Sequence, residues 1–207
     1  MDKNKLIDNI VLLEWKQFQA TQNEGGRASC QDDFETFNIM RQSQYLAWYD
    51  DVTESYYNDL LTAESKPWNL VTEKYARMME STAPEEYKNL ADKLPKLSPE
   101  RIEKQEQIIS KRVKWEEDFA KKFPALHDTA RPIHTSQDTQ WETSFETYAR
   151  GEISTYSDKT VDLYLKMVED MDSKGQNLSE ITVLYMVKFY GYESLEKANE
   201  RYEKEND

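Results

Sequence analysis

Apolar residues recur at intervals of three, four and seven positions along most of this chain, which is the spacing of one face of an α-helix. In the first such segment, Ile7, Ile10, Val11 and Phe18 form one stripe. No stretch of convincing length alternates between apolar and polar residues, as a half-buried strand would. The pattern therefore predicts an all-α protein, a single-domain bundle of about seven to eight helices with a polar interior cleft.

Residues with clear start and stop preferences divide the chain into these helices. A capping box of Asp32 and Glu35 opens one helix, Ser136 caps another that Gly151 ends, and Ser179 begins a third. The expected helices are 3–20, 33–64 (one long helix or a kinked pair), 69–81, 84–90, 98–123, 137–150, 157–175, 179–191 and a charged segment after Ser194. We expect one domain over 1–207, with a soft boundary near 84–99 and a terminus that frays over 195–207.

Four charged side chains fall inside the apolar stripes, and they are the most informative feature of the sequence. Glu14 lies four residues before Phe18, and Arg41, Asp59 and Lys188 hold similar positions in later stripes. A charge that points at a core needs a partner there, because an unpaired buried charge costs several kcal/mol. Lys188 lies at the edge of its stripe, where a long side chain reaches solvent, so we leave it out of the site.

The other three charges cannot all satisfy one another within one helix. Eighteen residues of a straight helix separate Arg41 from Asp59 by roughly 27 Å. Glu14 is the best partner for Arg41, and the segment 133–157 is a second source of partners. These groups make either a ligand site or a purely structural network, and the second predicts direct contact between Glu14 and Arg41 with no cavity.

The segment 133–157 concentrates one histidine, four acids, one arginine and many hydroxyls. In the expected helix 137–150, Tyr148 lies on the apolar face, while Glu146 and Arg150 are four residues apart on another side. Glu146 and Arg150 belong either to a ladder of solvated ion pairs or to a functional site. His134 is either a loop hydrogen-bonder or an acid/base group.

The loop 24–33 is a candidate anion site, because Gly25 and Gly26 permit close backbone approach and Arg27 follows them. Cys30 in this loop is more typical of a small packed residue than of a nucleophile, since no matching histidine and asparagine order follows.

Composition excludes several classes of function. The net charge is −13, from 27 basic and 40 acidic residues, which argues against binding nucleic acid or an anionic membrane. No apolar run approaches the roughly 20 residues of a membrane span and no signal peptide is evident, so we expect a cytoplasmic protein. One cysteine and two histidines exclude a zinc finger, and the absence of Glu-x-x-His excludes the di-iron pattern. A Mg²⁺ or Ca²⁺ site of oxygen ligands stays open, and the sequence names no cofactor.

Several stretches taken together resemble an uncharacterised bacterial family, a domain of unknown function. They are LLEW at 12–15, GGRASCQDD at 25–33, TFNIMRQSQ at 36–44, SYYNDL at 55–60, NLVTEKYARMM at 69–79 and SFETYARGEISTYS at 144–157. The resemblance covers nearly the whole chain. It implies no established activity, although members of that family are sometimes joined to a nucleotidyltransferase-like domain.

We therefore expect a polar cleft that binds a small anionic ligand, such as a nucleotide or an amino-acid-like substrate, in a protein that is either an enzyme or a binding protein. The candidate acid/base groups are Glu14, Asp59, His134 and Glu146. The candidate ligand-binding groups are Arg27, Arg41, Gln44, Lys74, Tyr148 and Tyr156. The alternative is an adaptor for a partner protein, such as a nucleotidyltransferase-like enzyme, with its aromatic residues exposed as a patch.

Overall fold

The computed structural model describes residues 2–22 and 26–206, and within these ranges the chain forms helices and no β-strand. The α-helices are α1 (Lys3–Ala20), α2 (Phe34–Leu46), α3 (Asp50–Glu64), α4 (Leu70–Thr82), α5 (Pro84–Tyr87), α6 (Pro99–Lys122), α7 (Pro124–His127), α8 (Phe145–Ile153), α9 (Asp158–Ser173), α10 (Leu178–Phe189) and α11 (Leu195–Asn206). Three short 3₁₀ helices join them: η1 (Ser29–Asp32), η2 (Ala91–Lys93) and η3 (Thr135–Gln137). The prediction of an all-α protein is confirmed, with eleven α-helices in the described ranges instead of seven to eight.

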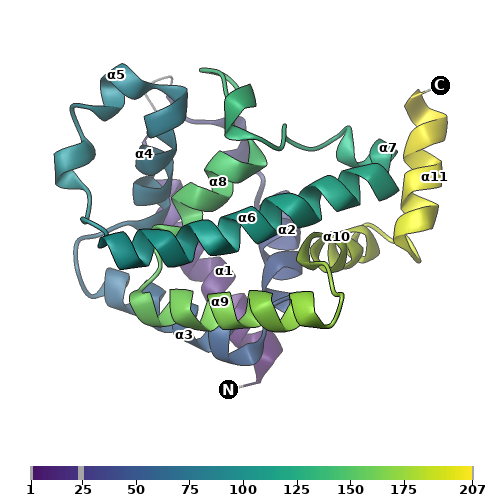
Figure 1. The fold of residues 1–207 in the computed structure, drawn as a ribbon, viewed down its shortest axis with the longest axis horizontal. Coiled ribbons are helices and arrows are strands. Elements are labelled where there is room, and N and C mark those ends of the chain that lie inside the picture. The colour runs from purple at the N-terminus through teal and green to yellow at the C-terminus, as the bar shows by residue number, and fades with distance from the viewer. Residues whose placement is uncertain (1, 23–25, 207) are drawn as a thin grey trace.

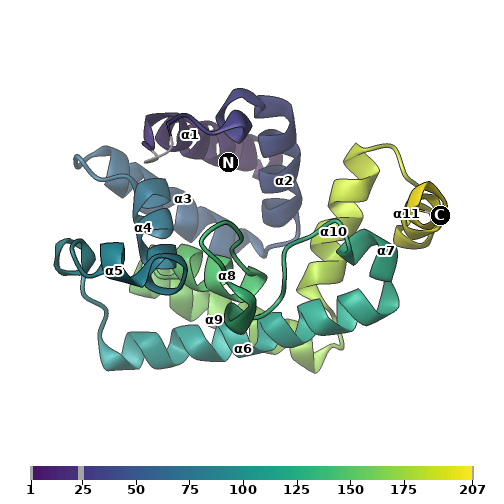
Figure 2. The same cartoon turned by 90° about the horizontal axis from the view of Figure 1, so that it is seen from above.

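The short helix α8 lies in the middle of the molecule (Figure 1). It packs against α4 on one side and against the long helix α6 on another. Helices α1, α2 and α3 form a group that Figure 2 shows above α8 and α6, while α7, α10 and α11 lie at the end of the molecule away from α5. Helix α8 is thus held between α4 and α6, and it positions the site described below.

Aromatic rings fill the core between these groups. Trp48 is 2% exposed, and its ring centre lies 4.9 Å from that of Tyr45 and 5.0 Å from that of Tyr164. Tyr56 and Tyr156 pack on the same cluster, with their ring centres 4.9 Å apart. Burial of such rings is the main stabilising contribution of this core, and their hydroxyl groups need polar partners inside it.

Most predicted helix starts are confirmed by the cap that forms them. Asn69 accepts a hydrogen bond from the Thr72 amide at 2.9 Å, and Ser98 and Ser157 cap α6 and α9 in the same way. The long segment predicted at 33–64 is the kinked pair, divided into α2 and α3 at 47–49. Two caps are shifted by one or two residues from the prediction, since Asp33 caps α2 and Asn177 caps α10.

The predicted helix 137–150 is wrong. The helix begins at Phe145, after the cap Ser144, and continues through Gly151 to Ile153. Upstream, the Asp138 carboxylate accepts from the Ser144 amide at 2.6 Å and the Thr139 hydroxyl accepts from the Glu142 amide at 3.0 Å. These side chains take over the amides that a helix would use, which is why Asp and Thr favour turns and caps.

The terminal helix α11 is helical to Asn206. No helix in the described ranges is both long enough and apolar enough to cross a membrane.

Candidate functional site

Glu14 and Arg41 form a buried ion pair between α1 and α2. Arg41 donates from Nε to Glu14 Oε2 at 2.8 Å and from Nη2 to Glu14 Oε1 at 2.5 Å. The two residues are 3% and 7% exposed, so the fork-like pairing occurs out of water. The contact that the apolar stripes predicted is confirmed.

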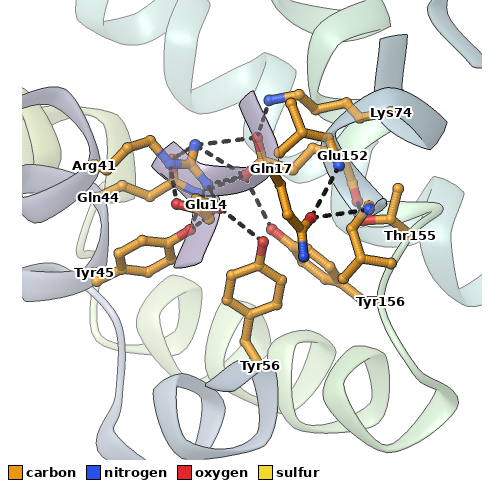
Figure 3. Close-up of polar contacts among 12 residues, drawn as sticks. Glu14, Gln17, Arg41, Gln44, Tyr45, Tyr56, Lys74, Glu152, Thr155 and Tyr156 are labelled. Carbon is orange, nitrogen blue, oxygen red and sulfur yellow. Dashed lines mark hydrogen bonds and ion pairs between the residues drawn. The ribbon is translucent and has the colours of Figure 1, made fainter. Parts of the chain in front are cut away.

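A second carboxylate, that of Glu152 on α8, also contacts Arg41. Its Oε2 lies 3.2 Å from Arg41 Nη1 and 3.3 Å from Lys74 Nζ, and its Oε1 accepts from Gln44 Nε2 at 2.7 Å and from the Tyr156 hydroxyl at 3.0 Å. Figure 3 shows Glu152 among Arg41 and Gln44 of α2, Lys74 of α4 and Tyr156, which follows α8. The sequence interpretation missed Glu152 because it ended the helix at Gly151. A helix continued to Ile153 places Glu152 seven residues after Phe145, on the same face.

Two tyrosines complete the surroundings of Glu14. The hydroxyls of Tyr45 and Tyr56 each donate to Glu14 Oε1 at 2.7 Å. Burial and the neighbouring carboxylate raise the pKa of both phenols well above the usual range, so both stay protonated and act as donors. We call the set Glu14, Arg41, Gln44, Tyr45, Tyr56, Lys74, Glu152 and Tyr156 the buried network.

Charged groups of the buried network oppose the effect of burial on one another's pKa. Burial alone would raise the pKa of Glu152, but Arg41, Lys74 and the Gln44 hydrogen bond hold it well below the usual range. Burial alone would lower the pKa of Lys74, but Tyr148 and Glu152 raise it above the usual range. Glu152 is therefore ionised at neutral pH between two charged cations, Arg41 and Lys74, and the hydrogen bonds among these groups satisfy them.

A row of rings on α8 continues from the buried network toward the surface. Phe145 and Tyr148 are three residues apart on one helical face and are half-buried. Lys74 Nζ donates to the Tyr148 hydroxyl at 2.8 Å and lies 4.3 Å from the ring centre. Arg131 stacks on the same ring at 4.7 Å, and Arg112 of α6 stacks on Phe145 at 5.0 Å. We call Arg112, Arg131, Lys74, Phe145 and Tyr148 the ring cluster.

Within the described ranges, the two arginines of the ring cluster have no carboxylate partner. In the described part of the chain, no acidic oxygen lies within 4.0 Å of the Arg112 or the Arg131 guanidinium. Arg131 donates from Nη1 to the Thr143 carbonyl at 3.2 Å. Glu116, one turn after Arg112 on α6, lies 3.6 Å from Nδ1 of His127 instead. Among the described residues, the two arginines of the ring cluster thus carry positive charge without a carboxylate in direct contact.

Backbone hydrogen bonds fix the position of Arg131. The next two carbonyls, of Pro132 and Ile133, accept from the amides of Phe145 and Glu146 at 2.7 and 3.0 Å. These amides belong to the first turn of α8 and have no partner within the helix. The segment that carries Arg131 is therefore attached to the start of the helix that carries Tyr148.

Six of the ten candidate residues converge at this place: Glu14, Arg41, Gln44, Lys74, Tyr148 and Tyr156. Asp59 does not, because its carboxylate accepts from the Ser157 amide at 3.0 Å and the Thr160 hydroxyl at 2.6 Å, at the start of α9. His134 lies 3.3 Å from Glu117, away from the network. Glu146 pairs with Arg150 at 2.8 Å on another side of α8.

Arg27 also lies apart from the ring cluster. It pairs with Asp32 at 2.9 Å and donates to the Gln31 carbonyl at 2.7 Å, so it stabilises its own loop. Cys30 is exposed, so the expectation that it is a packed residue is wrong. The loop positions Glu24 and Gly25 lie outside the described residues.

A cavity of about 790 Å³ lies on the other side of α8, between α4, η2 and α6. Its arginines already have partners, because Arg150 binds both oxygens of Glu106 at 2.8 and 2.9 Å and Arg77 pairs with Glu73 at 2.7 Å. None of the ten candidate residues lines this cavity, so it does not coincide with the predicted site.

No group of three or more histidine, cysteine, aspartate or glutamate residues in the described ranges is arranged to hold a metal ion.

Comparison with other proteins identifies a family. Searches of curated proteins and of solved structures found no match for this chain. A family model described as "Protein of unknown function (DUF4125)" matches residues 4–200, which include every residue of the buried network and the ring cluster, and the chain belongs to that family.

Proposed function

We propose that this protein binds a small anionic ligand at the ring cluster, beside Tyr148, with Arg131, Arg112 and Lys74 supplying the positive charge. The observation that supports the proposal most directly is the pair of arginines stacked on adjacent rings of α8, with no carboxylate partner among the described residues. In a chain of net charge −13, most other cations have an acid within reach, as Arg27, Arg41 and Arg150 do.

Lys74 and Arg131 lie close together against the Tyr148 ring, and the repulsion between these two cations indicates that a bound anion would stabilise the arrangement. Lys74 Nζ and Arg131 Cζ each lie within 5 Å of the Tyr148 ring centre, so they are at most about 9 Å apart. Two like charges at that distance repel by about 2 kcal/mol at an effective dielectric constant of 20. Glu152 compensates Lys74 but not Arg131. An anion bound between these cations would turn the repulsion into attraction.

The donors also suit an oxyanion. Arg131 uses one of its five N–H groups in the Thr143 bond, which leaves a planar fork for a carboxylate or phosphate group. The Tyr148 hydroxyl accepts from Lys74, so its own proton can be donated to a ligand. Arg112 lies beneath the neighbouring ring, where burial lowers its pKa but nearby phenols and carboxylates, Tyr164 first, raise it above the usual range.

The buried network has a different role in this proposal. Glu14 and Arg41 bind each other, and their other hydrogen bonds go to Tyr45, Tyr56, Gln44 and Glu152 within the buried network. Together with Gln44 and Tyr156 they hold Glu152, and so they hold α8 in place. Lys74 and Tyr148 join the two parts, because Lys74 contacts both Glu152 and the Tyr148 hydroxyl.

Binding of inorganic phosphate at low ionic strength tests the proposal, by calorimetry and by the shift of the melting temperature. We expect a dissociation constant in the millimolar range or tighter for the wild type, and at least roughly tenfold weaker binding in Arg131→Gln and Arg112→Gln. Arg201→Gln is the matched control, since it removes the same charge from an exposed pair with Glu205 on α11. Equal phosphate affinity in wild type, R131Q and R201Q would refute the proposed site.

A further inference from the structure

Trp141 is by far the most exposed large apolar side chain in the described residues. Its exposed fraction is 90%, compared with 57% for Leu12, the next in order. Full exposure of an indole ring is unfavourable, because the ring could bury a large apolar area elsewhere. Such a residue indicates a binding surface if its backbone is held in place.

The backbone around Trp141 is held by a closed set of hydrogen bonds. The Thr139 hydroxyl accepts from the amides of Trp141 and Glu142 at 3.2 and 3.0 Å, and the Thr139 amide donates to the Glu142 carbonyl at 2.9 Å. This is the pattern of a tight turn stabilised by a side chain at its start. The indole ring is therefore presented on a defined turn.

Asp138 attaches this turn to α4 and α8. Its carboxylate accepts from the Ser144 amide at 2.6 Å and from the hydroxyls of Ser81 and Thr147 at 2.5 and 2.6 Å. Burial alone would raise the pKa of Asp138, but these hydrogen bonds lower it, so the carboxylate stays charged and remains a strong acceptor.

The turn lies next to the ring cluster. Arg131, which has no carboxylate partner in the described part of the chain, donates to the carbonyl of Thr143, two residues after Trp141. Two residues of extended chain span at most about 7 Å, so the Cα of Trp141 lies within that distance of the Cα of Thr143, the residue that Arg131 binds.

We propose that Trp141 is the aromatic wall of the anion site, and that the ligand is a carboxylate or phosphate ester attached to a planar ring. This inference rests on the proposed function and names its ligand class. The anionic group binds Arg131 and Lys74, and the ring stacks on the indole, which buries the most exposed apolar side chain of the described residues.

The experiment compares ligands that share an anionic group and differ in the ring. Dissociation constants are measured for methyl phosphate and phenyl phosphate, and for acetate and benzoate, on wild type, Trp141→Ala, Trp141→Phe and Tyr190→Ala. Tyr190 is a matched control because it is an exposed ring, 49% accessible, at the end of α10. Trp141→Ala changes an almost fully exposed side chain, so it should melt at the wild-type temperature.

We expect the wild type to bind each ring-bearing anion roughly tenfold more tightly than its ringless counterpart. In W141A that preference should vanish while methyl phosphate binds as before, W141F should retain part of it, and Y190A should retain all of it. A wild type without preference for the ring would overturn this inference while leaving the anion site in place, and would leave Trp141 as a contact for a partner protein. Loss of methyl phosphate binding in W141A would also overturn it, whereas failure of the wild type to bind any of the four anions would overturn the proposed function itself.

Discussion

Replacement of Glu152 by glutamine is the strongest test of the buried network. The side chain keeps its shape, but the carboxylate that faces Arg41 and Lys74 is lost, and both cations stay buried with Glu14 as the only remaining acid of the network. Removing one partner of a buried ion pair typically costs about 3–5 kcal/mol. For a protein of this size, 1 kcal/mol corresponds to about 2–4 °C, so E152Q should melt about 6–20 °C below the wild type.

Thermal and urea unfolding at several pH values measure this cost. The pKa of Glu152 is lower in the folded protein than its ordinary value of 4.5, so its contribution is fully present above that pH and is lost as the pH falls toward the folded-state pKa. The stability difference between wild type and E152Q should therefore be constant near neutral pH and should narrow below about pH 4.5. A double-mutant cycle with Lys74→Met should give a coupling of about 0.5–3 kcal/mol, since the second change removes a cation that the first leaves unpaired.

Glu146→Gln is the matched control on the same helix. Glu146 is half-buried and pairs with Arg150, which keeps Glu106 as a second partner, so its loss should cost about 1 kcal/mol or less. A cost for E152Q within about 1 kcal/mol of that for E146Q would refute the reasoning, because the buried charges would then tolerate the loss of their partner.

Two further predictions concern packing and pH. Gly151→Ala should destabilise the protein by about 1–3 kcal/mol in urea unfolding, because the added Cβ would lie 2.8 Å from Met78 Cγ and 3.0 Å from the Lys74 carbonyl. Gly175→Ala is the control, because no atom lies near its Cβ position and the change reports only the cost of its positive φ. Glu116, which lies 3.6 Å from Nδ1 of His127, raises the pKa of His127. His127 therefore stabilises the fold below pH 6.5 and loses this contribution as the pH rises through the folded-state pKa. In His127→Gln the melting temperature should vary less between pH 6 and 8, and a pH profile equal to that of the wild type would contradict the pairing.

The sequence predicted the fold class because helical periodicity and caps are local properties. Asn69, Ser98 and Ser157 each precede a polar–apolar repeat, and each caps the helix that follows. The prediction of a helix at 137–150 was wrong because Asp138 and Thr139 hold the chain in a turn through hydrogen bonds to Ser81, Ser144 and Glu142. The bond to Ser81 comes from a helix more than fifty residues away, and no local pattern reveals it.

The candidate site was predictable where a charge lay at the centre of a stripe. Glu14 and Arg41 were found this way, and each needed the other. Asp59 satisfied the same rule but serves the start of α9, because the partner of a charge depends on which helix packs beside it. Arg112 and Arg131 were missed because a guanidinium stacked on a ring has no signature in the spacing of one helix.

The position of α8 connects the buried network to the ring cluster. A helix of nine residues is too short to be stable by itself, so tertiary contacts must hold it. Glu152 attaches its last turn to α1 and α2 through Arg41, and its first amides attach the segment that carries Arg131. The ring of Tyr148 lies between these two attachments, so Lys74 and Arg131 are held against it before any ligand arrives. A site arranged in advance loses less free energy to ordering when it binds. In the proposed function, the buried network would therefore act on binding through the position of α8, and its charges would need no contact with the ligand.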